Sequence, residues 1–313
     1  MTTAYYTHAA CKGHDMGPGH PECPQRLDAI ADHLLATGLD LALDFREAPR
    51  AAIADLERAH TAAYVRELKA AFERAAEEGR PIAFDPDTSG TPATFEAALR
   101  AAGAAVAATD AVIDGDIENA FCAVRPPGHH ATRDQTMGFC FFNNVCVAAR
   151  HALDVRGLER VAIFDFDVHH GNGTEDIVAG DERVLMLSFF QHPLYPSNGA
   201  VPLGTNMVNV PVPPYSKGPE ICAMVEQMWR PRLADFRPQM VFVSAGFDAH
   251  REDDMGQLGL VESDYAALTQ FIKRVADEHA GGRLVSCLEG GYSLSALARS
   301  VAAHLRVLAE VHG

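Results

Sequence analysis

The sequence lacks several features that would place it in whole classes of proteins. No stretch approaches the roughly 20 consecutive apolar residues of a membrane-spanning helix, and the first residues, MTTAYYTHAACKGHD, contain no basic segment followed by an apolar run. Basic residues are scarce, with 26 Lys and Arg against 42 Asp and Glu and a net charge of -16. Such a chain repels phosphate backbones and anionic lipid surfaces. We therefore expect a cytoplasmic protein with no nucleic-acid partner and no membrane partner.

The signatures of two common enzyme chemistries are also missing. The chain has no GxxxxGK[ST] phosphate loop and no GxSxG elbow, and its GNG segment at residues 171–173 lacks the rest of a dinucleotide fingerprint. Its 7 cysteines form no CxxC pair, which is typical of a reducing compartment. Nucleotide-dependent and serine-hydrolase functions are therefore excluded. The cysteines are interpreted as small, buried apolar residues.

What the sequence does contain indicates an α/β fold. Of its 313 residues 48% are apolar, and no shift in composition divides them, which predicts one domain over residues 1–313. Near-continuous apolar runs, typical of parallel strands covered on both faces, alternate with apolar residues at helical spacing. Irregular stretches at residues 81–94 and 191–219 interrupt the alternation, and long loops of this kind are usually functional. The predicted strands are residues 4–7, 120–124, 161–165, 183–189, 240–244 and 283–288.

The densest polar cluster follows directly after the apolar run at residues 161–164. Because side chains alternate along a strand, Asp165, Asp167 and His169 begin on one face where this strand ends. Open parallel sheets bind ligands beyond the carboxyl ends of their strands. Two carboxylates and an imidazole suit zinc or another divalent ion and leave a coordination position for water. The alternative interpretation is that this segment only caps the next helix.

Three more predicted strands also end in ionisable residues. One runs into Asp248, a further carboxylate that can complete a metal site. Another leads through a rigid Pro-Pro-Gly turn to His129 and His130, for which metal ligation, core packing and acid/base chemistry all stay open. The last leads into an EGGY segment in which Gly290 allows close approach of the main chain to a ligand. There the phenol of Tyr292 either packs or donates a hydrogen bond to a developing oxyanion.

Taken in order, the segments HPECPQRL, RPPGHHA, GFCFFNN, DFDVHHGNGT, GFDAH and EGGY resemble the zinc-dependent histone deacetylases and the bacterial histone deacetylase-like amidohydrolases. Asn172 and the EGGY segment are similar to those of class II members. The resemblance implies a single-domain arginase-deacetylase fold, in which helices flank a central eight-stranded parallel sheet and loops at the carboxyl ends of the strands form the active site. Two departures affect the predicted mouth of the site: Phe190 stands where many relatives have histidine, and Asp254 where a proline is usual.

The same resemblance implies a role for each motif residue. Zinc ligands fall on Asp167, His169 and Asp248, the tandem histidines on His129 and His130, and the transition-state tyrosine on Tyr292. Asp165 is expected to orient His129, and Asn172 is expected to face His130. A structural potassium ion is implied at Asp165, with the carbonyls of Asp167, His169 and Phe189 and the hydroxyl of Ser188.

Substrate contacts follow from the resemblance in the same way. Gly138, Phe139 and Tyr195 match the wall of a narrow acyl-lysine tunnel, and Asp87 aligns with an acid at the rim. Met255 occupies the position at which polyamine-selective relatives carry an acidic side chain, which favours an acyl-lysine substrate.

We therefore expect a zinc-dependent deacetylase, an amidohydrolase that removes acetyl or other short acyl groups from N-epsilon-acyl-lysine or similar amides with metal-activated water. Hydroxamates are expected to inhibit it. The alternatives are an acetylpolyamine deacetylase, a binuclear manganese ureohydrolase and a silent acyl-lysine binding protein. The expected cofactors are zinc and structural potassium. The expected partner is an acylated lysine or acylated amine, and a homo-oligomer is left open.

Overall fold

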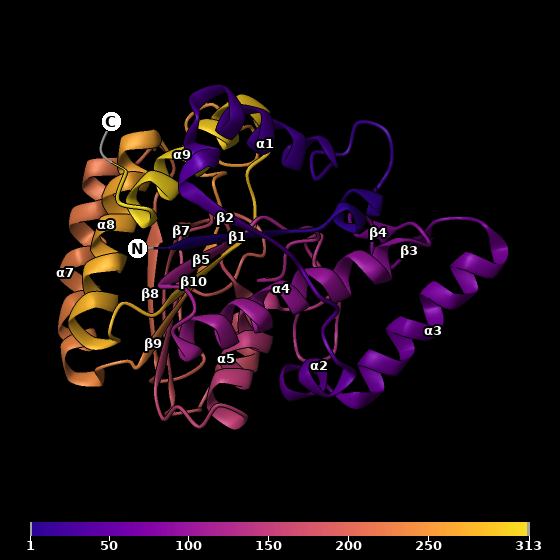
Figure 1. Ribbon diagram of the computed structural model, residues 1–313, viewed down its shortest axis with the longest axis horizontal. Helices are drawn as coiled ribbons and strands as arrows, with labels where there is room; N and C mark the ends of the chain where they lie inside the picture. The colour runs from indigo at the N-terminus through magenta and orange to yellow at the C-terminus, as the bar shows by residue number, and fades with distance from the viewer. Residues whose placement is uncertain (1, 312–313) are drawn as a thin grey trace.

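A computed structural model of the protein describes residues 2–311. Eight strands form one parallel sheet in the order β2-β1-β5-β10-β9-β6-β7-β8, and two short strands form a separate hairpin (Figure 1). The strands are β1 (Thr3–Thr7), β2 (Leu43–Glu47), β3 (Ile82–Ala83), β4 (Ser89–Gly90), β5 (Asn119–Cys122), β6 (Val161–Asp165), β7 (Val184–Gln191), β8 (Met207–Val212), β9 (Met240–Ala245) and β10 (Leu284–Leu288). The predicted eight-stranded parallel sheet is confirmed.

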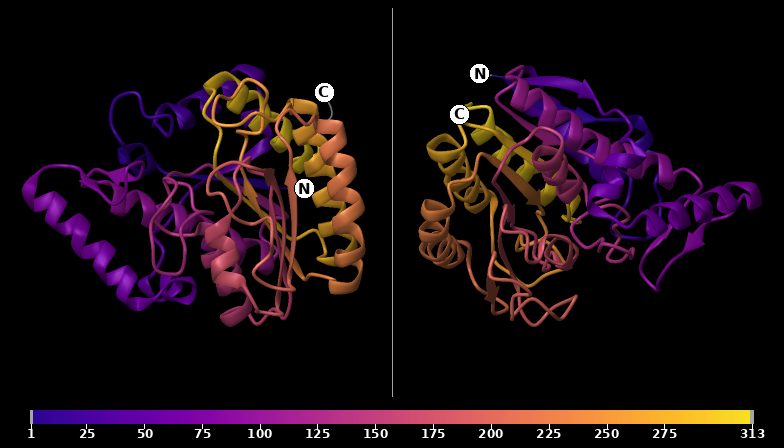
Figure 2. Two further views of the ribbon diagram at one scale, coloured as in Figure 1. Left: turned by 180° about the vertical axis from the view of Figure 1, so that it is seen from behind. Right: turned by 90° about the horizontal axis from the view of Figure 1, so that it is seen from below.

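Helices cover both faces of the sheet. Helices α1, α9, α8 and α7 pack side by side on one face, and α4 and α5 lie on the other, with α2 against α5 (Figures 1 and 2). This arrangement buries the apolar strands on both sides, as their sequences require. The helices are α1 (Gln25–Thr37), α2 (Ile53–Ala59), α3 (Ala62–Glu78), α4 (Thr94–Asp114), α5 (Asn144–Asp154), α6 (Asn172–Val178), α7 (Gly218–Phe236), α8 (Glu262–His279) and α9 (Leu294–Leu308), with short 3-10 helices η1 (Ala9–Gly13) and η2 (Leu39–Ala42).

The structure corrects the sequence interpretation at both edges of the sheet. Residues 191–219 were expected to be irregular, but they contain β8, which pairs with β7. Pro211 is tolerated in β8 because an edge strand can spare one main-chain donor. Strand β2, at the opposite edge, was not predicted because its sequence, LDFRE, is short and charged. Cys23 and Cys222 are partly exposed, contrary to the expectation that all the cysteines are buried.

The four central strands β5, β10, β9 and β6 are neighbours in the sheet and point the same way. Their carboxyl ends therefore meet at one edge, which brings together the polar segments that follow each of them. Among residues 2–311, no helix is long and apolar enough to cross a membrane.

Candidate active site

Three buried side chains form a candidate metal site at this edge. Asp167 and His169 follow β6, Asp248 follows β9, and their ligand atoms all lie within 4.8 Å of one another. His169 Nδ1 is 3.1 Å from Asp167 Oδ1 and 3.3 Å from Asp248 Oδ2. Burial raises the pKa of Asp248 to about 7, and the neighbouring charge of Asp167 adds to the effect. Asp248 Oδ2 is buried without a hydrogen-bond partner, so the donor set fits a divalent cation such as zinc.

Main-chain groups from two strand ends, those of β6 and β10, hold the two carboxylates in place. Asp167 Oδ2 accepts a hydrogen bond from Gly290 N–H at 2.9 Å, and Asp248 Oδ1 accepts one from Val168 N–H at 2.9 Å. A Cβ atom on Gly290 would lie 2.1 Å from Asp248 Oδ2, and one on Gly246 would lie 2.0 Å from Asp167 Oδ2. Glycine is therefore required at both positions, and Gly290 lies against the carboxylates.

The tandem histidines differ in their partners. His129 Nδ1 is 3.0 Å from Asp165 Oδ2, whereas His130 Nδ1 is 2.7 Å from Asn172 Oδ1. Burial opposes a charge on His129, but the carboxylates of Asp167 and Asp165 outweigh it and raise its pKa well above the ordinary value. Burial lowers the pKa of His130, and the positive charge of His129 lowers it further. The arrangement therefore favours a cationic His129 beside a neutral His130.

The amide of Asn172 also selects the tautomer of His130. An amide oxygen only accepts hydrogen bonds, so His130 Nδ1 carries the proton that it donates to Asn172 Oδ1. The Nε2 atom of the neutral ring is then a free base. An imidazole in this form can take a proton from an attacking water.

Tyr292 lies across the site, on the loop after β10. The main-chain N–H of Tyr292 donates to Asp253 Oδ2 at 2.6 Å, and the guanidinium carbon of Arg26 is 5.0 Å from the centroid of the Tyr292 ring. Arg26 also donates to the carbonyls of Glu289 and Gly291, at 2.5 and 2.6 Å, which fixes the loop. Burial raises the pKa of Tyr292 well above its ordinary value, so its hydroxyl stays protonated and available as a donor.

A cavity of about 330 Å³ leads down to these groups. Gly138, Phe139, Tyr195, Asp87 and Met255 all line it, together with His130, His169 and Tyr292. The ring centroids of Tyr195 and His130 are 5.1 Å apart, and those of Phe139 and Tyr292 are 6.1 Å apart. Gly138 adopts a positive φ, and a Cβ there would lie 2.4 Å from the ring of His130. Its lack of a side chain therefore makes room for that ring.

Sequence reasoning missed two residues of the cavity mouth. His20 and Pro21 line it, and the His20 ring meets Phe139 edge to face with centroids 4.7 Å apart. Both belong to the HPECPQRL segment, so the motif carried the signal even though no mouth position was assigned to it. Phe190 is buried against the ring of His170 and Asp254 is exposed; neither is among the residues that line the cavity.

Three of the predicted potassium ligands lie on neighbouring strands. Asp165 and Ser188 are register partners on β6 and β7, and Phe189 follows Ser188 directly. The Ser188 hydroxyl is buried and has no hydrogen-bond partner. A buried oxygen atom without a hydrogen-bond partner is a suitable ligand for a hard cation.

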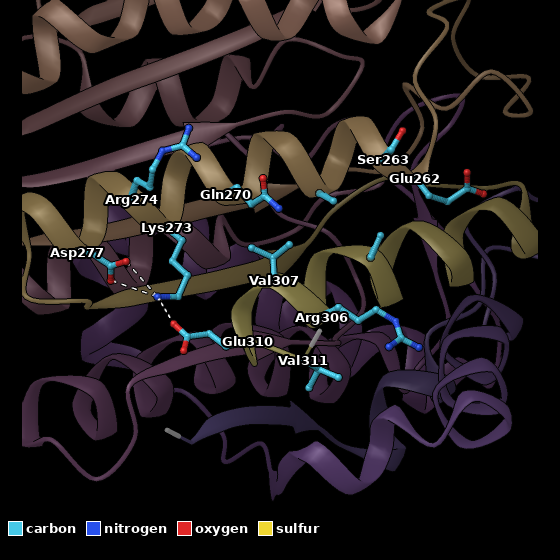
Figure 3. Close-up of a pocket in the computed structure, with 12 residues that line it drawn as sticks. Glu262, Ser263, Gln270, Lys273, Arg274, Asp277, Arg306, Val307, Glu310 and Val311 are labelled. Carbon is cyan, nitrogen blue, oxygen red and sulfur yellow. Dashed lines mark hydrogen bonds and ion pairs between the residues drawn. The ribbon is translucent and has the colours of Figure 1, made fainter. Parts of the chain in front are cut away.

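A second, wider hollow of about 710 Å³ lies between α8 and α9 (Figure 3). None of the predicted site residues lines it. Its Lys273 is paired with Asp277 at 3.1 Å and with Glu310 at 2.8 Å. The hollow therefore lies on the helical face, apart from the polar strand ends.

Comparison with known proteins identifies the family of this chain. The family model for the histone deacetylase domain matches residues 20–308. The histone deacetylase-like amidohydrolase of Pseudomonas aeruginosa is 36% identical, over 93% of this chain and 82% of that protein. A probable deacetylase of Archaeoglobus fulgidus is 37% identical, over 94% of this chain and 82% of that protein. The polyamine deacetylase HDAC10 of Mus musculus is 36% identical, over 92% of this chain and 44% of that protein.

A solved structure gives the same result. The crystal structure of the HDA15 HD domain superposes with a TM-score of 0.89 and 31% identity, covering 99% of this chain and 88% of that chain. The protein therefore belongs to the histone deacetylase domain family.

Proposed function

We propose that the chain is a zinc-dependent deacetylase that hydrolyses the amide bond of N-epsilon-acyl-lysine or of a similar acylated amine. The observation that carries the proposal is the buried cluster of Asp167, His169 and Asp248 beside the free base of His130, at the end of a cavity with aromatic walls. Bound there, zinc supplies a Lewis acid that polarises the amide carbonyl and acidifies a water. One catalytic domain spans residues 1–313 in this proposal.

The chain's own residues then carry the remaining chemistry. His130 Nε2 takes the proton of the attacking water, and the Tyr292 hydroxyl donates a hydrogen bond to the oxygen that becomes negative. His129, held by Asp165, carries a positive charge beside the developing anion. The leaving amine is protonated either by His130, which passes on the proton taken from the water, or by His129. Phe139 and Tyr195 exclude water from the acyl chain.

Two secondary assignments belong to the same proposal. Potassium would be held by Asp165, Ser188 and the carbonyls of Asp167, His169 and Phe189. The substrate is preferentially an acyl-lysine, because Met255 gives the mouth an apolar side chain where a polyamine would need an acid.

An acetylated polyamine is the second candidate substrate, because one relative is named a polyamine deacetylase and Asp87 places a carboxylate at the mouth. The binuclear ureohydrolase is disfavoured, since residues 2–311 contain a single cluster of candidate metal ligands. A silent binding protein is disfavoured because His129, His130 and Tyr292 surround that cluster.

The test is steady-state turnover of acetyl-, propionyl- and trifluoroacetyl-lysine peptides beside acetylated polyamines, with zinc-loaded protein. Turnover of the lysine peptides with the higher kcat/KM supports the proposal. Turnover of polyamines alone moves the assignment to the second candidate, and no turnover of any of them contradicts the reaction.

A further inference from the structure

The strand β2 leaves one edge of the large sheet open. It is the outermost strand on the side of β1, and in the part of the chain that the structure describes no strand pairs with its outer side. The indigo segment that contains it lies at the rim of the molecule (Figure 2). Phe45 in this strand is 53% exposed, and Leu41, two residues before the strand, is 89% exposed. An exposed edge with apolar side chains is a template for pairing with another strand.

The register fixes which main-chain groups of β2 are free. Ala48 N–H donates to Thr7 O at 2.9 Å, and Thr7 is opposite Glu47. In a parallel pair, the N–H and C=O of one residue point to the same side of the strand, and this side alternates from one residue to the next. Because the N–H of Ala48 faces β1, the main-chain groups of Arg46 and Asp44 face β1 as well. The main-chain groups of Phe45 and Glu47 and the carbonyl of Leu43 therefore face outward, whereas the Leu43 N–H is already bonded to Asp40 O.

The sequence of β2 is complementary to itself in one antiparallel register. When a second copy pairs with Phe45 opposite its own Phe45, the two residues exchange both main-chain hydrogen bonds, and each Glu47 N–H meets a Leu43 carbonyl. Asp44 of each copy then lies opposite Arg46 of the other. Pairing centred on Asp44 or on Arg46 instead would oppose like charges, which destabilises a pair of strands.

We propose that the protein forms a two-fold symmetric homodimer through β2, in which the sheets of the two copies become one continuous sheet. The interface is isologous, because each copy contributes the same strand in the same register. Across the seam, Phe45 meets Phe45 on one face, and two Asp44–Arg46 pairs form on the other. Within one copy, Arg46 Nε is 2.8 Å from Asp44 Oδ2, so both charges are already held on that face of the strand.

The dimer is expected to be weak. One five-residue strand buries a small interface, and the net charge of -16 on each copy opposes association. We expect dissociation in roughly the micromolar range.

Sedimentation velocity of the zinc-loaded protein over about 1 to 100 μM tests the proposal. Wild type is expected to shift from monomer to dimer over this range. Arg46→Asp and Asp44→Arg each set like charges opposite one another and are expected to weaken dimerisation at least tenfold. The double variant D44R/R46D restores opposite charges and is expected to dimerise like wild type. Phe45→Glu, which places two carboxylates at the two-fold axis, is a second disrupting variant should either charge variant fold poorly.

Arg80→Asp is the matched control, because Arg80 forms a similar exposed ion pair with Glu78, at 2.7 Å, in a segment away from β2. It is expected to leave the monomer–dimer equilibrium unchanged. A wild-type protein that stays monomeric throughout overturns the proposal. So does a dimer that the single variants leave intact, or a double variant as monomeric as the single ones.

Discussion

The carboxylate of Glu289 accepts a hydrogen bond from the main-chain N–H of His129 at 3.1 Å, and so joins the loop after β10 to the loop after β5. The same oxygen accepts from Gly128 N–H at 2.6 Å, and the other oxygen accepts from the Ser244 hydroxyl at 3.1 Å. Glu289 is fully buried, and burial raises its pKa to about 7. One side chain thus connects the tandem-histidine loop, the Tyr292 loop and β9.

Replacing Glu289 by alanine is expected to lower kcat at least tenfold with little change in KM. The change leaves two buried N–H groups without acceptors, at a cost of about 1–3 kcal/mol each, and frees the loop that carries His129. Glu289→Gln, which keeps an acceptor oxygen, is expected to stay within a few-fold of wild type. Steady-state kinetics of the folded variants on an acetyl-lysine peptide is the measurement; equal kcat for the alanine variant and wild type would show that the loop holds without Glu289.

Tyr292→Phe is expected to lower kcat on the order of 100-fold while KM barely moves, because the lost hydroxyl acts on the transition state and not on bound substrate. The same peptide assay measures it. A phenylalanine variant with near wild-type kcat would make Tyr292 a packing residue.

Met255→Glu is expected to shift the kcat/KM ratio towards N8-acetylspermidine by about 5- to 30-fold, or roughly 1 to 2 kcal/mol. A glutamate at the mouth gains a charge-assisted contact with the distal ammonium, which methionine does not offer. Met255→Gln is the control for size without charge. The explanation fails if wild type already prefers acetylpolyamines over acetyl-lysine peptides tenfold or more.

The stability of the protein is expected to fall in acid partly through His304. This side chain is buried beneath the sheet between Thr269 and Ser286, with contacts of 2.7 and 3.0 Å, and burial lowers its pKa to about 3. Above pH 6.5 the histidine is neutral in both states. Below pH 6.5, His304 binds a proton in the unfolded chain but stays neutral in the folded chain until about pH 3. The free energy of unfolding therefore falls as the pH falls through this window, by up to about 1.4 kcal/mol per pH unit.

In His304→Gln this proton uptake is absent. Between pH 6 and 4 the slope of the unfolding free energy against pH is therefore expected to decrease by the equivalent of about one bound proton. Denaturant unfolding of both zinc-loaded proteins at several pH values measures the difference, and metal loss in acid affects both alike. Parallel curves for the two proteins would mean that His304 does not contribute.

Much of the site could be predicted from the sequence because its residues follow four buried strands directly. Once the strands are parallel, Asp167, Asp248, His130 and Tyr292 must meet at one edge of the sheet. The residues of the cavity mouth were harder to predict. His20 is far in sequence from the four strand ends, and only the tertiary fold brings it to the mouth.

A buried charge network near the site was also invisible in the sequence. Glu22 binds Arg125 through an oxygen 2.6 Å from Nη2, and Arg26 through the other at 3.0 Å, and all three side chains are inaccessible to solvent. Charged residues in a sequence are usually solvated, and only the tertiary structure shows that one carboxylate pairs with two guanidinium groups in the interior.

The central claim is that catalysis depends on a zinc ion held by Asp167, His169 and Asp248. The most direct measurement is elemental analysis of active protein, paired with turnover of an acetyl-lysine peptide and inhibition by a hydroxamate. The expected result is one zinc per chain in active wild type, with metal and turnover both lost in Asp248→Ala. Fully active protein that contains no divalent metal would contradict the account.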